Sequence, residues 1–185
     1  MPKPFLSTGP WTLSLRANVL EHLHFPLAAL RVWCNALMPG GILLLRVPDK
    51  RFTFDAPRQR TSLDHLVLEE AAPEAYDPGS HYADWVEHIH KTSPAQSNFE
   101  RKVKELLDRK FSIHFHVWTD VDVREILNYT INEWKLPWRP VFSLHAHFYR
   151  KEAVVVLQKD SEIGQSGCGD LTLNNNVLLV SESHR

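Results

Sequence analysis

The stretch NVLEHLHFPLAALRVWCNALMPGGILLLRVPDKR, residues 18–51, decides the fold of this chain. Its apolar residues recur at steps of four and three, which predicts a core-facing helix over residues 26–38; they are Leu23, Leu27, Leu30, Cys34 and Leu37. Pro39-Gly40-Gly41 breaks that helix. The unbroken apolar run that follows predicts a strand over residues 42–47, covered by helices on both faces. The stretch therefore predicts an α/β protein.

A charged loop, Asp49-Lys50-Arg51, follows the carboxyl end of this strand. Open α/β sheets bind their ligands outside the carboxyl ends of the strands. We therefore expect Asp49, Lys50 and Arg51 to contact a polar substrate. Ordinary solvated loop charges explain the three residues equally well.

Composition limits the classes of partner. The chain has 185 residues, of which 43% are hydrophobic, and its 21 Lys and Arg are balanced by 22 Asp and Glu. This predicts one domain with a hydrophobic core and no binding to nucleic acid. No apolar run is long enough for a signal peptide or a bilayer span, so no membrane association is expected. Cys34 and Cys168 lie far apart, which favours a reducing compartment, and we predict a cytoplasmic location.

The two ends of the chain differ in composition from the middle. Residues 1–17 contain three prolines and are predicted to be irregular; residues 11–17 are the only candidate strand there. Residues 159–185 are rich in Ser, Gly, Asn and Asp and are predicted to be a disordered tail. The folded domain is therefore expected to span residues 18–158.

Residues 49–110 are rich in turn signals and are predicted to be a helical insertion, with helices at 62–71, 81–91 and 99–110. Ser97 and Glu100 predict a capping box for the third helix. Residues 111–118 alternate in polarity and should be extended, and Thr119 with Asp122 predicts another helix start. Residues 142–148 and 153–158 predict a closing antiparallel hairpin. The insertion is a candidate lid or substrate-binding region.

The run NVLEHLHFPLAALRVWCNALMPGGILLLRVPDKRFTFD, residues 18–55, resembles the region after the fourth strand of class I S-adenosylmethionine-dependent methyltransferases. It is most similar to small-molecule methyltransferases that carry a VLEHL segment and a PGG turn. FHVWT at residues 115–119 and the closing hairpin extend the likeness over roughly residues 15–158. The resemblance implies a partial Rossmann-like methyltransferase sheet of parallel strands, a terminal antiparallel hairpin and a helical insertion.

The same resemblance implies roles for particular residues. It places the cofactor S-adenosylmethionine against Ala17, Asn18 and Val19, and it makes His22 a candidate catalytic base that deprotonates a small-molecule methyl acceptor. A purely local role for His22, as a helix cap or hydrogen-bond partner, is the simpler alternative. The resemblance further implies an acceptor site where Arg51 meets a set of histidines, namely His65, His81, His114 and His116.

The sequence also departs from this family. It has no glycine-rich loop ahead of residue 18 and no acidic residue ending a second strand, although these features hold the cofactor in the family. We therefore expect an incomplete methyltransferase sheet that binds the cofactor poorly alone. Either the chain is truncated or another chain completes its site. An incomplete sheet would leave an open strand edge, which predicts self-association.

Two other classes of function stay open. One is a non-catalytic interaction module that uses the open sheet edge. The other is a histidine-based metal-binding protein, because eight of the 11 histidines form His-x-His pairs at 22/24, 88/90, 114/116 and 145/147. On a strand this spacing puts both rings on one face, so the last two pairs could supply four nitrogens. No residue is assigned to a metal, because strand histidines with ordinary hydrogen bonds are commoner.

Overall fold

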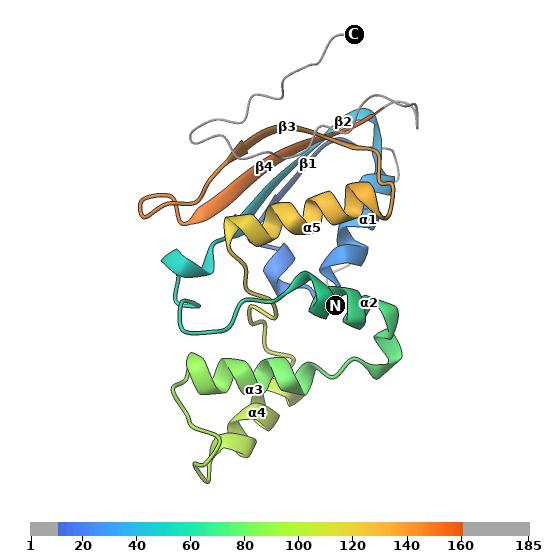
Figure 1. Cartoon of the computed structure of the whole chain (residues 1–185). Helices are drawn as coiled ribbons and strands as arrows, with labels where there is room; N and C mark the ends of the chain where they lie inside the picture. The colour runs from blue at the N-terminus through green and yellow to red at the C-terminus, as the bar shows by residue number, and fades with distance from the viewer. Residues whose placement is uncertain (1–10, 161–185) are drawn as a thin grey trace.

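The computed structural model describes residues 11–160, which contain a four-stranded mixed sheet and five α-helices (Figure 1). Strand β1 (Trp11–Ala17) runs parallel to β2 (Leu37–Pro48). Strand β4 (Glu152–Lys159) is antiparallel to both β2 and β3 (Trp138–Leu144), which gives the order β1-β2-β4-β3. The expected α/β class and the closing antiparallel hairpin are confirmed.

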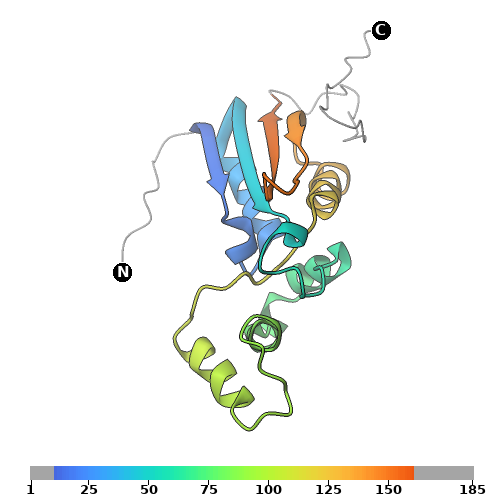
Figure 2. The same ribbon diagram turned by 90° about the vertical axis from the view of Figure 1, so that its left-hand side faces the viewer.

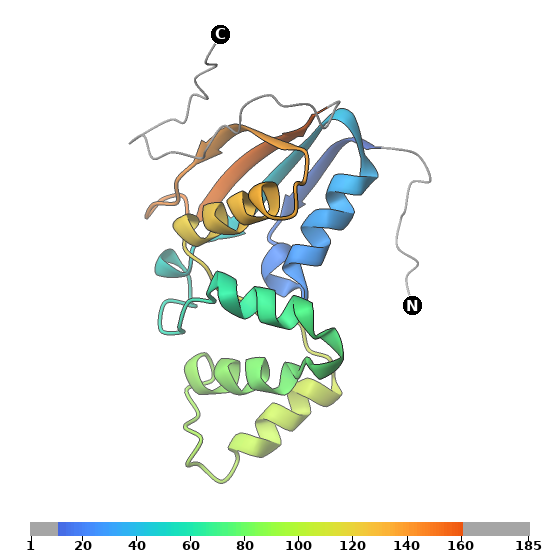
Figure 3. The ribbon, with the colours of Figure 1, turned by 45° about the vertical axis from the view of Figure 1, so that its right-hand side comes forward.

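Helices α1 (Pro26–Ala36) and α5 (Asp120–Asn132) lie on the same face of the sheet (Figure 3). Alternate residues of the two central strands face these helices and are almost fully buried; they are Leu43, Leu45, Val47, Val155 and Leu157. Leu27 and Leu30 of α1 and Leu127 of α5 are completely buried against them. The helical period of α1 and the alternation of the strands thus meet in one main core.

The junction between α1 and β2 differs from the predicted one. The helix ends at Ala36 instead of Met38, and Leu37 already pairs with Trp11 of β1. The next paired residues are Leu13 and Ile42, so the Pro-Gly-Gly segment is an irregularity inside a longer strand. Gly40 has φ of +77°, a backbone conformation that favours glycine.

The other face of the sheet is only partly covered. In β2 Ile42 and Leu44 are half-buried and Arg46 is exposed, so the prediction of a strand buried on both faces is wrong. Leu13 and Leu15 of β1 are 64% and 58% exposed. Residues 11–17 form the edge strand β1, so the prediction of an irregular segment is wrong there; pairing with β2 outweighs the weak local pattern. Residues 1–10 and the predicted tail at 161–185 lie outside the described residues.

Residues 49–110 contain three α-helices, as predicted, and these helices divide between two hydrophobic cores. Helix α2 (Leu63–Ala71) packs on the main core through Leu66. Helices α3 (Pro78–His88) and α4 (Phe99–Asp108) build a second core with Ile113 and Phe115. Figures 1 and 2 show α3 and α4 farthest from the sheet, with α2 between them and the sheet helices.

Capping residues in the sequence predicted some helix starts correctly and one incorrectly. The capping box of Thr119 and Asp122 begins α5 as predicted, and the Ser62 side chain caps α2. The capping box predicted from Ser97 and Glu100 is wrong, because α4 begins after Asn98 and has no side-chain cap.

Two extended segments also depart from their predicted pattern. Residues 111–118 run as an unpaired connection, apart from one bridge between Trp118 and Asp49, and His116 and Trp118 are completely buried. In β3 the face toward the helices carries Ser143, while Phe148 lies beyond the strand and is 73% exposed. Polar and apolar residues alternate in both segments, but packing against α3 and α5 determines which residues are buried.

No helix in residues 11–160 is both long and apolar enough to cross a membrane.

Candidate active site at the carboxyl ends of β1 and β2

The candidate site begins where β1 ends. Ala17 pairs with Arg46 of β2, and the Asn18 N–H donates to the Arg46 carbonyl oxygen over 3.0 Å. Asn18 then turns the chain with φ of +51°, a left-handed conformation that asparagine tolerates better than most residues. The chain passes through Val19 into a single helical turn over Leu20–His22, η1. This turn projects Glu21 and His22 beyond the strand end.

The segment at residues 113–116 docks on this turn through its backbone. The Phe115 N–H donates to the Glu21 carbonyl oxygen over 2.8 Å. The Nδ1–H of His22 in turn donates to the Ile113 carbonyl oxygen over 2.7 Å, which leaves Nε2 as the proton-accepting nitrogen of a neutral ring. Burial lowers the pKa of His22 below its usual value, although the Ile113 carbonyl partly offsets this. His22 is therefore held neutral, as a general base must be.

His114 stands edge-on to His22, with ring centroids 4.7 Å apart. Its Nδ1–H donates to Asp55 Oδ2 over 2.6 Å, and this fixes the ring so that Nε2 is free. Arg58 Nη1 lies 2.9 Å from the other oxygen of Asp55. Burial pushes the pKa of Asp55 up, but the hydrogen bonds from His114 and Arg58 outweigh burial, so the pKa lies below its usual value. A carboxylate-oriented imidazole of this kind suits proton transfer.

Glu21 lies beside His22 and His114 as the third titratable residue at this strand end. It is 2% exposed, and neither carboxyl oxygen has a hydrogen-bond partner among the described residues. Burial raises its pKa from 4.5 to about 7. One ligand-type atom from each of Glu21, His22 and His114 lies within 4.8 Å of the other two. The three side chains therefore form a compact cluster of titratable groups, and groups with perturbed pKa values often lie at functional sites.

His22 opens into a pocket of about 390 Å³ between η1, α3 and the end of α4. Its other polar lining residues include His24, Tyr82, Lys110 and Ser112, and Phe111 and Phe115 supply aromatic surface. This size and mixed lining suit a small organic molecule. The pocket therefore brings a neutral imidazole together with other hydrogen-bonding groups.

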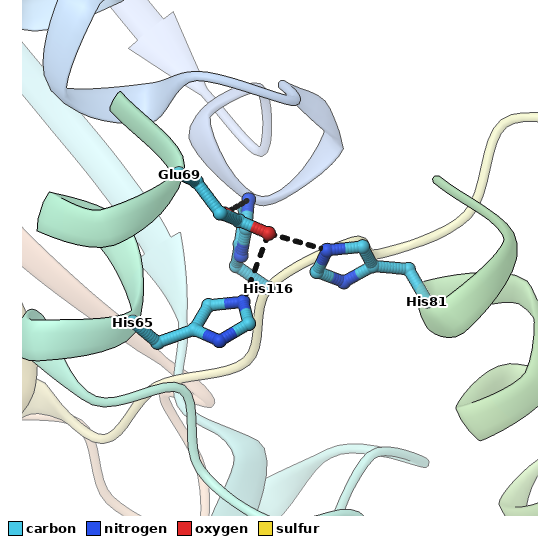
Figure 4. Close-up of side chains that lie close together, drawn as sticks. All are labelled: His65, Glu69, His81 and His116. Atoms are coloured by element: carbon cyan, nitrogen blue, oxygen red, sulfur yellow. Dashed lines mark hydrogen bonds and ion pairs between the residues drawn. The ribbon is translucent and has the colours of Figure 1, made fainter. Parts of the chain in front are cut away.

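A second cluster consists of His65, Glu69, His81 and His116 (Figure 4). Glu69 of α2 stands between three histidines: its Oε1 is 2.9 Å from His65 Nε2 and 2.8 Å from His81 Nε2, and its Oε2 is 3.7 Å from His116 Nε2. Burial acts to raise the pKa of Glu69, but the hydrogen bonds with His65 and His81 outweigh it and lower the pKa to about 2. Burial lowers the pKa of His116 to about 3. Glu69 is therefore ionised at neutral pH and His116 is uncharged.

A third network lies at the carboxyl end of β2. Asp49 is completely buried, and its carboxylate accepts hydrogen bonds from the Arg51 side chain and from the Asp120 N–H at the start of α5. Burial pushes the pKa of Asp49 up, but these hydrogen bonds outweigh it and leave the pKa lowered. Asp120 also contacts Arg51 Nη2 at 2.7 Å and His145 Nδ1 at 2.6 Å. This network joins β2, α5 and the hairpin.

The structure separates residues that we expected together. His65, His81 and His116 converge, but His114 points into the other cluster and Arg51 is engaged with Asp49 and Asp120. The expected acceptor site at Arg51 is therefore not formed in this arrangement. Lys50 donates to the Ala56 carbonyl oxygen and stabilises its own loop. The charges of the 49–51 loop serve mainly local structure.

The four-nitrogen site considered for the 114/116 and 145/147 pairs is also not formed. His114 bonds Asp55, His116 faces Glu69, and His145 bonds Asp120. The reason is that residues 114–116 are not in the sheet, so the two pairs share no face.

Sequence reasoning missed Asp55, Arg58 and Glu69. Asp55 closes the family-like run, but nothing local showed that it meets His114 at a separation of 59 residues. Glu69 had a usable signal, because His65 and Glu69 are four residues apart on a predicted helix and therefore share a face.

The chain was compared with known proteins. Searches with models of protein families, against curated proteins and against solved structures found no match.

Proposed function

We propose that this chain is an S-adenosylmethionine-dependent methyltransferase-like protein that binds a small-molecule methyl acceptor in the pocket beside His22. The observation that carries the proposal is the position of that pocket. It adjoins the turn after β1, which is the place that the resemblance of residues 18–55 assigns to the reacting groups. The α/β sheet with a parallel β1–β2 pair and a terminal antiparallel hairpin agrees with the proposal.

The described residues fit the acceptor better than the methyl donor. Between residues 11 and 160 the only glycines are Gly40, Gly41 and Gly79. None of them lies in the turn directly after β1. A glycine-free turn at Asn18 and Val19 hinders the close backbone approach that a nucleotide needs. We therefore propose that these residues form only the rim of a donor site. The bound donor would supply an electrophilic methyl group.

The described residues offer more groups for binding the methyl acceptor than for binding the methyl donor. We propose that an acceptor hydroxyl or amine binds in the pocket beside His22, whose neutral ring can accept a proton on Nε2. The His114 ring, fixed by Asp55, lies directly behind His22. In methyl transfer most of the rate enhancement comes from positioning, to which orientation contributes about 7–11 kcal/mol. The pocket and the rigid His22 ring would supply that orientation.

The proposal is tested by following backbone amide NMR signals while S-adenosylhomocysteine is added. We expect weak binding with shifts centred on Ala17, Asn18 and Val19, because these residues face the donor rim. Adenosine monophosphate is the control for non-specific nucleotide binding. Shifts spread over the surface, or none near residues 17–19 at millimolar ligand, would contradict the proposal.

A second test addresses the acceptor side. With a methyl acceptor identified by screening, His22→Gln should lower kcat more than it raises KM, because Gln keeps the hydrogen bond but cannot accept a proton. His88→Gln is the matched control, since His88 is bonded locally to Asp84. Equal activities of the two variants would remove His22 as the base.

An interaction module is a second candidate, and the exposed edge favours it. Within residues 11–160, β1 is an outer strand of the sheet and presents Leu13 and Leu15 to solvent. An outer strand with exposed leucines is a template for pairing with another chain. We propose that a second copy of this chain pairs here.

A cytoplasmic location remains part of the proposal. Cys34 is a free, buried thiol, and burial raises its pKa to about 11. An inert free thiol is compatible with a reducing compartment.

A further inference from the structure

The histidine cluster around Glu69 has the composition of a metal centre. We propose that His65, Glu69, His81 and His116 bind one divalent transition-metal ion of the zinc type. This site goes beyond the proposed methyl transfer and does not depend on it. One ligand-type atom from each of the four side chains lies within 4.8 Å of the other three.

Three separate segments bring the ligands together (Figure 4). His65 and Glu69 are four residues apart on α2 and so project from one face of that helix. His81 comes from α3, and His116 from the connection that leads to α5. Zinc–nitrogen and zinc–oxygen bonds are about 2.0–2.2 Å long, so an ion between the four groups needs shifts of under about 1 Å.

The hydrogen-bonding of His81 points to a cation. The Nδ1–H of His81 donates to the Phe115 carbonyl oxygen over 2.9 Å, so Nε2 of the neutral ring carries a lone pair. That lone pair lies 2.8 Å from Glu69 Oε1, which is itself an acceptor. Two acceptors face each other only if a cation or an extra proton lies between them. A backbone carbonyl on the far nitrogen is the arrangement that orients metal-binding histidines.

An unsatisfied atom in the same cluster supports this inference. Oε2 of Glu69 is buried without a hydrogen-bond partner among the described residues. The His116 nitrogen that faces it, Nε2, lies 3.3 Å from the His24 carbonyl oxygen, a contact that an ion would replace. A buried polar atom left unpaired costs roughly 1–3 kcal/mol, so such atoms need an explanation. His116 is completely buried and stacks on Trp118 with an interplanar angle of 18°, which fixes its ring plane. A metal ion would satisfy the carboxylate without rearranging the fold.

The site lies where the two hydrophobic cores meet. Helix α2 belongs to the main core, and α3 belongs to the second core. A metal ion held by both helices would fix the position of α3 and α4, and with them the wall of the pocket beside His22. His65 and His81 also line a second pocket of about 340 Å³, through which an ion can enter.

The ligand set selects the class of metal. Three imidazoles and one carboxylate suit zinc, cobalt, nickel or ferrous iron, whereas magnesium and calcium prefer oxygen ligands. We therefore expect zinc and cobalt to bind and magnesium not to compete.

The experiment uses the whole chain, purified without a histidine tag, stripped with chelator and dialysed against zinc. We expect one zinc ion per chain by elemental analysis and a higher Tm with zinc than with magnesium. Cobalt should give the visible absorption of a nitrogen- and oxygen-bound, tetrahedral ion. Substoichiometric zinc together with an unchanged Tm would overturn the proposal and leave a cluster of protonated histidines around Glu69.

Variants locate the ion. His81→Ala and Glu69→Gln each remove a proposed ligand. Loss of a ligand's hydrogen-bond partner weakens metal binding roughly 10- to 100-fold, so loss of the ligand itself should weaken zinc binding by more than that. His90→Ala is the matched control, because His90 is exposed and outside the cluster. Equal zinc affinity in His81→Ala and His90→Ala would overturn the assignment. If His81→Ala does not fold, the loss of the cobalt spectrum in His65→Gln, at a half-exposed position, decides the question.

Discussion

The Nδ1 atom of His114 lies 2.6 Å from Oδ2 of Asp55, and this contact ties the loop after β2 to the connection before α5. The two residues are 59 positions apart in the sequence. Arg58 extends the contact, because its guanidinium reaches Asp55 at 2.9 Å and Asp84 at 2.6 Å. The arrangement holds His114 behind His22 and joins the helical insertion to the strand ends.

Loss of the Asp55 carboxylate should be strongly destabilising. Asp55→Ala removes the more buried of the two carboxylates that contact Arg58, whose side chain is 2% exposed, and leaves only Asp84. It also removes the hydrogen-bond acceptor of His114. Breaking a buried ion pair in this way costs about 3–5 kcal/mol of unfolding free energy. Urea unfolding measures the loss. Asp108→Ala is the control, since its pair with Lys104 is exposed and should contribute about 1 kcal/mol or less. Similar losses in the two variants would contradict the role of Asp55.

Glu21 should make stability fall as pH rises. Because its folded pKa is raised from 4.5 to about 7, the folded protein binds more protons than the unfolded chain between these values. The stabilisation is complete below pH 4.5 and is lost as pH rises to about 7. At about 1.36 kcal/mol for each pH unit, the loss amounts to roughly 3 kcal/mol.

The variant Glu21→Gln tests this expectation. It should unfold at higher urea concentration than the wild type above pH 7, and the difference should shrink toward pH 4.5. Unfolding curves at several pH values give the comparison. Glu105→Gln, at an exposed position of α4, is the control. A constant difference across the pH range would show that Glu21 does not titrate in this window.

The capping box of α5 should contribute measurably to stability. The Thr119 hydroxyl accepts from the Asp122 N–H, and Asp122 accepts from the Thr119 N–H. Thr119→Ala should cost about 1 kcal/mol in urea unfolding. Asn98→Ala at the start of α4 is the matched control, because Asn98 makes no side-chain cap bond. A larger loss at Asn98 would contradict this difference between the two helix starts.

The exposed leucines of β1 should drive self-association. Leu13→Lys combined with Leu15→Lys should make the elution volume in size-exclusion chromatography independent of concentration, because charge on an edge strand blocks pairing. The fold should change little, since surface substitutions usually stay within about 0.5 kcal/mol. Val32→Lys, 60% exposed on α1, controls for added charge. A wild-type protein that is monomeric at high concentration would exclude this mode of pairing.

Much of the local structure could be predicted from the sequence. The 3.6-residue period of Leu27, Leu30 and Cys34 predicted α1, and the capping pair Thr119 and Asp122 predicted the start of α5. The alternation of residues 142–148 and the polar turn before residues 153–158 predicted the antiparallel pairing of β3 and β4. These signals are local, because they depend on residues that are neighbours along one helix or strand.

The sites could be predicted only in part. His22 was recognised from the segment that carries it, and three of the four histidines expected at the acceptor site do converge. Their centre is Glu69 instead of Arg51, because Arg51 is held by Asp49 and Asp120. Which side of the 113–117 segment a histidine faces depends on how that segment packs between the two cores.

Local patterns in the sequence were enough to predict the helices, strand β2 and the antiparallel hairpin, since hydrophobic period and capping residues act over a few positions. Strand β1 needed its pairing with β2, and the meeting of polar side chains needed the packed fold. Asp55 reaches His114, and Glu69 reaches His81 and His116, because β2, α2 and α3 pack against one connecting segment. Contacts between distant residues depend on the direction in which each element leaves the sheet, and no local pattern specifies that direction.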